Sequence, residues 1–175
     1  MIPTKTIYYF AYGSNMSTAR LQARVPSAKC LGVYSLPGYT LDFSMHGFDD
    51  SAKCNGRQTN NPNDQLYGVL FSMLDNERPI LDFHEQLGEG YEIIDTIVFD
   101  ENAQAHPCFV YTALRLQKHL QPFDWYRHHV LFGAKEAGLP QHVIEYINNT
   151  TAIVDQDHQR AEEQMSIYTQ TSIYE

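Results

Sequence analysis

Cysteine is scarce in this sequence, and its histidines are not spaced to bind metal. Cys30, Cys54 and Cys108 are the only cysteines among 175 residues, and no two of them form a Cys-x-x-Cys pair. An odd number at wide spacing indicates neither a disulfide framework nor a structural zinc site. No His-x-x-x-His occurs, and the neighbours His128 and His129 would point about 100° apart on a helix. We therefore predict reduced thiols and no bound metal.

Basic residues and long apolar runs are also lacking. Lys and Arg total 12 against 21 Asp and Glu, which gives a formal net charge of −9. This charge argues against nucleic acid or an anionic membrane surface as a partner. No apolar run approaches the ~20 residues of a membrane-spanning helix, and residues 1–6 lack the apolar segment of a signal peptide. We expect a cytoplasmic protein, either a monomer or a homodimer.

Aromatic residues, by contrast, are plentiful. There are 12 Tyr and 9 Phe against a single Trp, and tyrosines suit pocket walls that are apolar with polar tips, as well as an ordinary half-buried core. Apolar density falls after about Asp155. We expect one domain over residues 1–154 and a tail over 155–175. The tail is either loosely attached or adds a terminal strand through Ile167, Tyr168, Ile173 and Tyr174.

Apolar patterning predicts strands separated by short helices. The expected strands cover residues 7–12, 39–44, 65–73, 91–100 and 107–114, and the expected helices cover 17–24, 76–87, 124–137 and 141–148. Residues 48–64 are rich in Asp, Asn, Gly and Ser, which predicts a long loop. Because the elements do not alternate as βαβ units, the fold class is α+β: a small mixed β-barrel of about five to seven strands with short flanking helices.

The stretch Tyr8–Met16 is the most informative part of the chain. It reads as an aromatic strand that ends at Gly13 and leads through a tight loop into a helix. Such a loop leaves backbone N–H groups unpaired, which suits a carboxylate or a developing oxyanion. The same pattern also fits a plain turn at Gly13 followed by a helix cap from Ser14, Asn15 or Ser17.

Three motifs in register resemble the γ-glutamylcyclotransferase family. They are Tyr12-Gly13-Ser14-Asn15, then Leu81-Asp82-Phe83-His84-Glu85-Gln86 followed by Gly90-Tyr91, and finally Gly133-Ala134-Lys135-Glu136-Ala137-Gly138-Leu139-Pro140. The likeness covers about residues 7–148. It implies a small mixed barrel and a small-molecule substrate, a γ-glutamyl amide. Attack of the substrate's α-amine on its own γ-carbonyl would give 5-oxoproline and a free amine, with no cofactor.

The resemblance also implies the site residues. Glu85 matches the family's catalytic glutamate and would move the proton as general acid and base, with burial against Phe83 or Tyr91 raising its pKa. Asp82 and Glu89 are the nearest alternative carboxylates, and an unselected glutamate at a helix end is normally solvated. We expect Tyr91 near the site. Tyr111 matches a family tyrosine, although an ordinary strand tyrosine fits its position equally well.

In the loop, the backbone N–H groups of Gly13, Ser14 and Asn15 are assigned to the substrate's α-carboxylate, with the oxyanion as the alternative, and Tyr12 would shape the pocket. The leaving amine stays open. The segment 51–57 departs from the family pattern, and its Lys53 or Arg57 could contact whatever lies beyond the γ-amide.

Two other classes of function remain as alternatives. One is a hydrolase or acyltransferase with Ser14 or Cys54 as the nucleophile and a histidine base, although no Gly-x-Ser-x-Gly elbow surrounds Ser14. The other is a non-catalytic binding protein that keeps the anion-binding loop. Iodoacetamide sensitivity would favour the first, and thermal stabilisation by 5-oxoproline or glutamate without turnover would favour the second.

Overall fold

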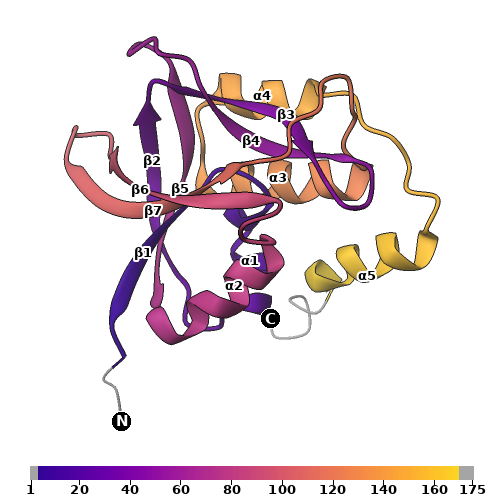
Figure 1. The fold of residues 1–175 in the computed structure, drawn as a ribbon, viewed down its shortest axis with the longest axis horizontal. Helices are drawn as coiled ribbons and strands as arrows, with labels where there is room; N and C mark the ends of the chain where they lie inside the picture. The colour runs from indigo at the N-terminus through magenta and orange to yellow at the C-terminus, as the bar shows by residue number, and fades with distance from the viewer. Residues whose placement is uncertain (1–3, 170–175) are drawn as a thin grey trace.

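A closed barrel forms the body of the molecule. The computed structural model describes residues 4–169. Around the barrel the strands follow the order β1 (Thr6–Ala11), β5 (Gln65–Leu74), β2 (Lys29–Pro37), β6 (Tyr91–Phe99) and β7 (Ala105–Ala113), as Figure 1 shows. Neighbouring strands are antiparallel except for β1 and β7, which are parallel and complete the ring. The predicted small mixed barrel is confirmed.

A separate hairpin of β3 (Tyr39–His46) and β4 (Ala52–Gln58) extends from the barrel. The sequence predicts β3 but assigns residues 48–64 to a long loop, so β4 corrects that expectation. Strand β4 reads Ala-Lys-Cys-Asn-Gly-Arg-Gln, without a β-branched residue. Its strand conformation comes from pairing with β3 and from burial of Ala52, Cys54 and Asn55, a tertiary effect that local propensity does not carry.

Strand β2 was also missed by sequence analysis. A register shift against β5 falls between Cys30 and Gly32, and Gly32 has a φ of 124°. This irregularity interrupts the alternation of buried and exposed side chains on which a strand prediction relies. The remaining predicted strands are present within one or two residues of their expected ends.

Short helices surround the barrel. The expected helices appear as α1 (Thr18–Arg24), α2 (Arg78–His84) preceded by the 3₁₀ turn η2 (Asp75–Glu77), α3 (Asp124–Ala137) and α4 (Gln141–Asn149). Gly138 ends α3 with a φ of 76°, as its αL-cap position predicts. No helix among residues 4–169 is long and apolar enough to cross a bilayer.

The backbone of α3 touches the loop that follows β1. A Cβ built on Gly133 would lie 2.3 Å from the backbone N of Ser17 and 2.5 Å from the carbonyl carbon of Met16. Only glycine fits this approach. The packing holds the 3₁₀ turn η1 (Ser14–Met16) against α3, and η1 carries part of the site described below.

The end of the described chain is helical. Residues His158–Thr169 form α5, where the sequence suggested a loose tail or a terminal strand. Gln164 Oε1 accepts a hydrogen bond from Arg20 Nη1 at 2.6 Å, and the ring centroids of Tyr168 and Phe132 lie 4.4 Å apart. These contacts with α1 and α3 stabilise a segment whose own sequence is mostly polar. Ile173 and Tyr174 lie outside the described residues.

Candidate active site

The loop after β1 presents free backbone donors. No residue within 4–169 accepts a hydrogen bond from the backbone N–H of Gly13, Ser14 or Asn15, whereas Met16 N donates to Gly13 O at 3.0 Å. The φ of Gly13 is −114°, so glycine is not needed here for a left-handed turn. Space favours it instead, because a Cβ on Gly13 would lie 3.0 Å from Cys54 Cβ, a contact that a shift of a few tenths of an ångström would have to relieve.

Glu85 directly follows helix α2 and turns back toward this loop. Its Oε1 accepts a hydrogen bond from Asn15 Nδ2 at 2.8 Å and lies 3.6 Å from Arg24 Nη1. The Glu85 side chain is 15% exposed. Gln86, with a φ of 51°, makes the sharp turn that ends α2. The carboxylate is therefore largely buried and held by residues from the other end of the domain.

Burial controls the proton affinity of Glu85. Desolvation raises the pKa of its carboxyl above the ordinary value of 4.5, and the positive charge of Arg24 and the hydrogen bond from Asn15 oppose that rise without cancelling it. A carboxyl with a raised pKa is a stronger base, and its protonated form is a proton donor closer to neutral pH. These are the properties that a general acid and base needs.

A small cavity brings the predicted site residues together. Its volume is about 30 Å³, and it is lined by Tyr9, Tyr12, Gly13, Ser14, Asn15, Cys54, Glu85, Tyr91, Tyr111 and Tyr126. All seven residues named from the sequence are in this set. The structure thus places the carboxyl of Glu85 and the loop after β1 on one cavity.

Three tyrosines of the cavity form hydrogen bonds with backbone atoms through their hydroxyl groups. Tyr12 OH donates to the carbonyl of Tyr111 at 2.7 Å, and Tyr91 OH donates to the carbonyl of Cys54 at 2.8 Å. Tyr126 OH accepts from Cys54 N at 3.0 Å. Burial raises the pKa of Tyr12, Tyr91 and Tyr126 well above that of a free phenol, so they are neutral at physiological pH. They form a rigid wall with polar groups that carry no charge.

The alternative carboxylates lie outside this cavity. Asp82 accepts a hydrogen bond from Tyr111 OH and lies 3.7 Å from Arg78 Nε. Glu89 is exposed. Phe83, expected as a wall for Glu85, is 78% exposed on the last turn of α2 and is not part of the cavity lining. Of the two aromatic walls named for Glu85, the structure retains Tyr91.

The chemistry at Cys54 and Ser14 does not favour a covalent nucleophile. Cys54 is 2% exposed, and burial raises the pKa of its thiol to about 12. The thiol form predominates at neutral pH, and the thiol is the poor nucleophile of the pair. No histidine lines the small cavity. His84 lines the adjoining larger cavity together with Ser14, but within residues 4–169 no hydrogen bond joins the two side chains.

Three residues at the site were not expected from the sequence: Tyr9, Arg24 and Tyr126. Tyr9 accepts a hydrogen bond from Asn15 Nδ2 at 3.2 Å, and Arg24 donates to Asn15 Oδ1 at 3.1 Å. One pattern in the sequence could have indicated Arg24: Arg20 and Arg24 are four residues apart and therefore share a face of α1. Tyr126 carries no such signal, because only the packing of α3 brings it to β4.

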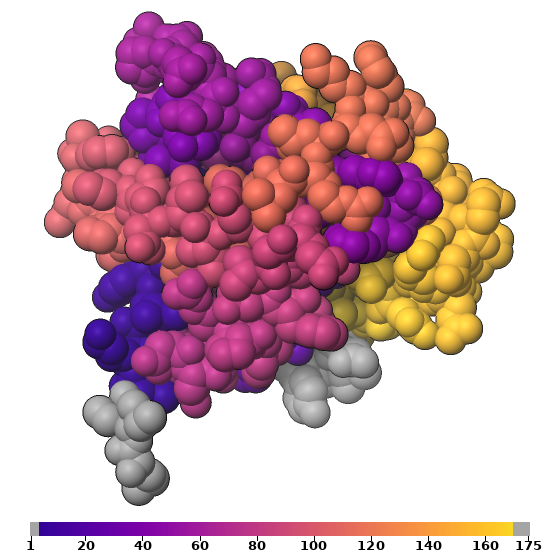
Figure 2. Space-filling model, in the orientation of Figure 1, coloured from indigo at the N-terminus to yellow at the C-terminus, as the bar shows by residue number. Residues whose placement is uncertain are grey.

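A second and larger cavity adjoins the first. Its volume is about 360 Å³, and it shares Ser14, Glu85, Tyr91 and Tyr126 with the small one. The rest of its lining includes Phe48 and Lys53 from the β3–β4 hairpin, His84 and Gln86 after α2, and Arg160 of α5. Figure 2 shows these three segments (purple, pink and yellow) side by side on the face in view. Lys53 is therefore placed beside the site, whereas Arg57 pairs with Asp42 at 3.0 Å and lies outside the lining.

The candidate site has no metal-binding cluster in the described part of the chain. No group of three or more His, Cys, Asp or Glu side chains within residues 4–169 is arranged to hold a metal ion. The chemistry that the described residues offer is one buried carboxyl, backbone N–H donors and neutral phenols.

Comparison with known proteins gives consistent matches. A family model described as the AIG2-like family matches residues 65–149. The chain is 30% identical to human gamma-glutamylcyclotransferase over 158 residues, covering 88% of this chain and 82% of that protein. For the mouse gamma-glutamylcyclotransferase the identity is 32% over 145 residues, covering 81% and 77%.

Solved structures show the same fold. One gamma-glutamyl cyclotransferase superposes with a TM-score of 0.78 and 25% identity, covering 91% of this chain and 99% of that one. YkqA from Bacillus subtilis superposes with a TM-score of 0.71 and 21% identity over 85% of this chain and 56% of its own, which supports the fold alone.

Proposed function

The chain belongs to the γ-glutamylcyclotransferase family of enzymes, and we propose that it cyclises a γ-glutamyl amide to 5-oxoproline with Glu85 as general acid and base. One observation carries the proposal: the buried Glu85 carboxyl and the free amides of the loop after β1 line one cavity. A γ-glutamyl group has an α-ammonium and an α-carboxylate on the same carbon. The cavity offers an acceptor for the first and donors for the second.

In the proposed reaction the nucleophile is part of the substrate. The α-nitrogen attacks the γ-carbonyl carbon, a new C–N bond closes the five-membered ring, and the original amide C–N bond breaks. The α-ammonium loses two protons as it becomes the lactam N–H, and the leaving nitrogen gains two as it becomes an ammonium. Because the reacting groups are tethered, holding the chain in its curled conformation supplies much of the rate.

Glu85 is proposed to carry the first proton between the two nitrogens, and the second passes from the ring nitrogen to solvent while the released amine takes one up from solvent. The Glu85 carboxylate takes a proton from the α-ammonium, and the resulting carboxyl gives it to the leaving nitrogen as the tetrahedral intermediate collapses. The raised pKa of Glu85 lies closer to the pKa of the α-ammonium, which makes the carboxylate a stronger base toward it and keeps more of the carboxyl protonated near neutral pH. Asn15 and Arg24 hold the carboxylate at one position, so the same group reaches both nitrogens.

The loop amides are proposed to bind the α-carboxylate. The N–H groups of Gly13, Ser14 and Asn15 have no other acceptor among the described residues, and the neutral tyrosines add no competing charge. The alternative use of the same amides, on the oxyanion at the γ-carbon, would stabilise the transition state by a few kcal/mol per donor. The first assignment predicts a change in KM when the loop is altered, and the second a change in kcat.

The test is direct. Purified protein is incubated with a panel of γ-glutamyl-amino acids and γ-glutamylamines, and release of 5-oxoproline is followed by chromatography. We expect turnover of at least one substrate, without added metal and without an acyl-enzyme in the mass spectrum. Absence of 5-oxoproline across the panel, together with thermal stabilisation by the same compounds, would instead identify a binding protein.

A further inference from the structure

The larger cavity beside Glu85 is positively charged, although the protein as a whole carries a net charge of −9. Arg20, Arg24, Lys53 and Arg160 line it, together with Asp49 and Glu85. His84 also faces it, and burial lowers the pKa of that imidazole, so it is neutral at physiological pH. Because this cavity adjoins the small one at Glu85, the leaving amine of a bound γ-glutamyl amide would extend into it.

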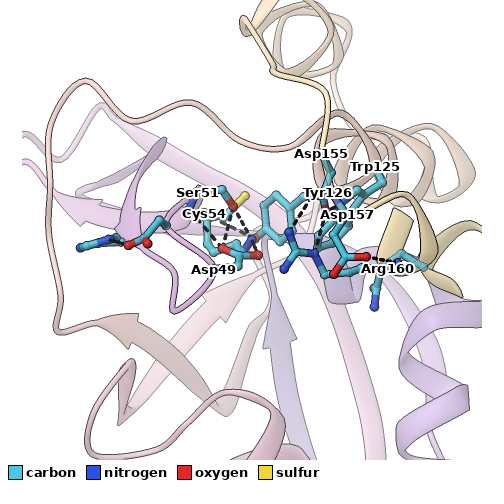
Figure 3. A network of polar contacts seen from close by, with 12 residues as sticks. Asp49, Ser51, Cys54, Trp125, Tyr126, Asp155, Asp157 and Arg160 are labelled. Atoms are coloured by element: carbon cyan, nitrogen blue, oxygen red, sulfur yellow. Dashed lines mark hydrogen bonds and ion pairs between the residues drawn. The ribbon is translucent and has the colours of Figure 1, made fainter. Parts of the chain in front are cut away.

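Three of the four cations already have a carboxylate. Arg24 lies 3.6 Å from Glu85, and Lys53 donates to Asp49 at 2.6 Å. Arg160 donates to both oxygens of Asp155 at 2.6 Å. Figure 3 shows Asp49 and Ser51 on one side of Tyr126 and the Asp155–Arg160 pair on the other. Each of these three cations is therefore balanced by a carboxylate. The unbalanced positive charge of the cavity belongs to the fourth cation.

That fourth cation is Arg20. It forms no ion pair with any residue in 4–169, and its guanidinium makes a single side-chain hydrogen bond, from Nη1 to Gln164. Its Nε is buried without a hydrogen-bond partner in the described chain. Burial and the neighbouring Arg24 lower the pKa of Arg20 to about 9, so it stays a cation at neutral pH. A partly buried cation without a carboxylate is unfavourable by itself, and an anionic ligand would relieve that cost.

We propose that Arg20 is a specificity-determining residue that binds a carboxylate on the leaving amine. This assignment rests on the proposed cyclisation, and it selects leaving groups that carry an acid over neutral or cationic amines. A guanidinium matches a carboxylate with two parallel hydrogen bonds, which an ammonium cannot offer. Lys53 lines the same cavity as Arg20 and adds positive potential, although its ammonium is paired with Asp49. An amine with a second positive charge would be repelled.

The test uses two substrates that differ by one carboxylate, γ-glutamyl-L-alanine and γ-glutamyl-ethylamine. The measured quantity is the ratio of their kcat/KM values in the wild type, in Arg20→Gln and in Arg20→Lys. A hydrogen bond to a charged group is worth ~1.5–3 kcal/mol, so we expect the wild type to favour the alanine compound by about tenfold or more. Arg20→Gln should bring the ratio close to one, and Arg20→Lys should fall between. Arg57→Gln, which removes an arginine outside the cavity, should leave the ratio unchanged.

Several outcomes would overturn the assignment. A wild-type ratio near one, or a ratio that survives Arg20→Gln, removes Arg20 from leaving-group recognition. An equal loss on both substrates would mean that Arg20 acts on the γ-glutamyl group that they share or on Glu85, whose pKa its charge lowers, and would reject the leaving-group assignment. If Arg20→Gln does not fold, the wild-type ratio is measured at increasing NaCl concentration. A preference that depends on charge must fall as salt screens it, and a ratio that does not change with salt refutes the assignment.

Failure of the proposed function itself is distinguished by binding. Dissociation constants for both compounds are measured by calorimetry on the wild type, or on Glu85→Gln where the wild type turns the compounds over. A preference for the alanine compound that depends on Arg20, without 5-oxoproline release, would keep the subsite and reject the reaction. Equal affinities would reject the subsite.

Discussion

Asn15 and Glu85 are 70 residues apart in the sequence, yet Asn15 Nδ2 donates a 2.8 Å hydrogen bond to Glu85 Oε1. The Oδ1 of the same amide accepts from Arg24, and its Nδ2 also reaches Tyr9 OH at 3.2 Å. Asn15 is 3% exposed. The loop that supplies free backbone donors is thus also the element that orients the acid.

Glu85→Gln should abolish 5-oxoproline release while the protein still folds. Loss of a general acid and base lowers rates by about 10²–10⁴-fold. Glu85→Asp should retain little activity, because its carboxylate is retracted by one methylene and loses contact with Asn15. Activity is measured by product release and folding by circular dichroism. Glu89→Gln, an exposed glutamate on the same turn, is the matched control and should behave as wild type. Turnover by Glu85→Gln at the wild-type rate would refute the assignment.

Asn15→Ala should lower kcat by about tenfold or more and move the acid limb of the pH profile upward. The hydrogen bond from Asn15 lowers the pKa of Glu85, so its removal leaves burial less opposed and the carboxyl protonated at higher pH. The profile of kcat/KM against pH reports this shift. Asn55→Ala removes another buried asparagine, one that donates to Ser44, and should not move the limb. An unmoved limb in Asn15→Ala would mean that the contact is only structural.

Glu85→Gln should also gain stability relative to wild type as pH rises. The folded-state pKa of Glu85 is raised above 4.5, so its contribution is fully present below that value and is lost as pH rises through the folded pKa. Glutamine at this position does not titrate, so its contribution to the free energy of unfolding does not change with pH. The difference in unfolding temperature, variant minus wild type, should therefore grow between about pH 4 and about pH 8. A difference that is flat or shrinks over this range would contradict the raised pKa.

Gly133→Ala should destabilise the protein by about 1–3 kcal/mol, since the new methyl group collides with the backbone of Met16 and Ser17. For a chain of this size the unfolding temperature should fall by about 3–10 °C. Substrate affinity should fall as well, because the displaced turn carries the loop amides. Lys135→Ala, at an exposed position of the same helix, should change neither. A Gly133→Ala protein with wild-type stability would show that the turn can move away without cost.

Iodoacetamide should modify Cys30 and leave both Cys54 and the activity intact. Cys30 is exposed, whereas Cys54 is buried and its thiol has a pKa of about 12. Peptide mapping after a timed reaction identifies the modified residue, and 5-oxoproline release is measured on the same sample. Inactivation that tracks modification of Cys54, or an acyl group trapped on it, would favour covalent catalysis instead.

The strands and helices that could be predicted from the sequence are those whose patterns are local. The apolar runs of β1, β5, β6 and β7, the Gly138 stop after α3 and the glycine turn after β1 are each carried by neighbouring residues. Strands β2 and β4 and helix α5 were missed. Strand β2 and helix α5 depend on partners far along the chain, since β2 pairs with β5 and α5 packs on α1 and α3. Strand β4 pairs with its neighbour β3, but its residues have no local strand preference.

The chain's own residues determined which groups are available for chemistry: Glu85, a glycine loop, many tyrosines and no pattern for metal. Their family-like order indicated that Glu85 and Tyr12–Asn15 belong together. Only the tertiary structure decided that Asn15 orients Glu85, that Phe83 faces solvent, and that Arg20 lacks a carboxylate among residues 4–169. The physical reason is that pKa shifts, hydrogen bonds and charge balance depend on distances of a few ångströms between side chains, and closure of the barrel sets those distances.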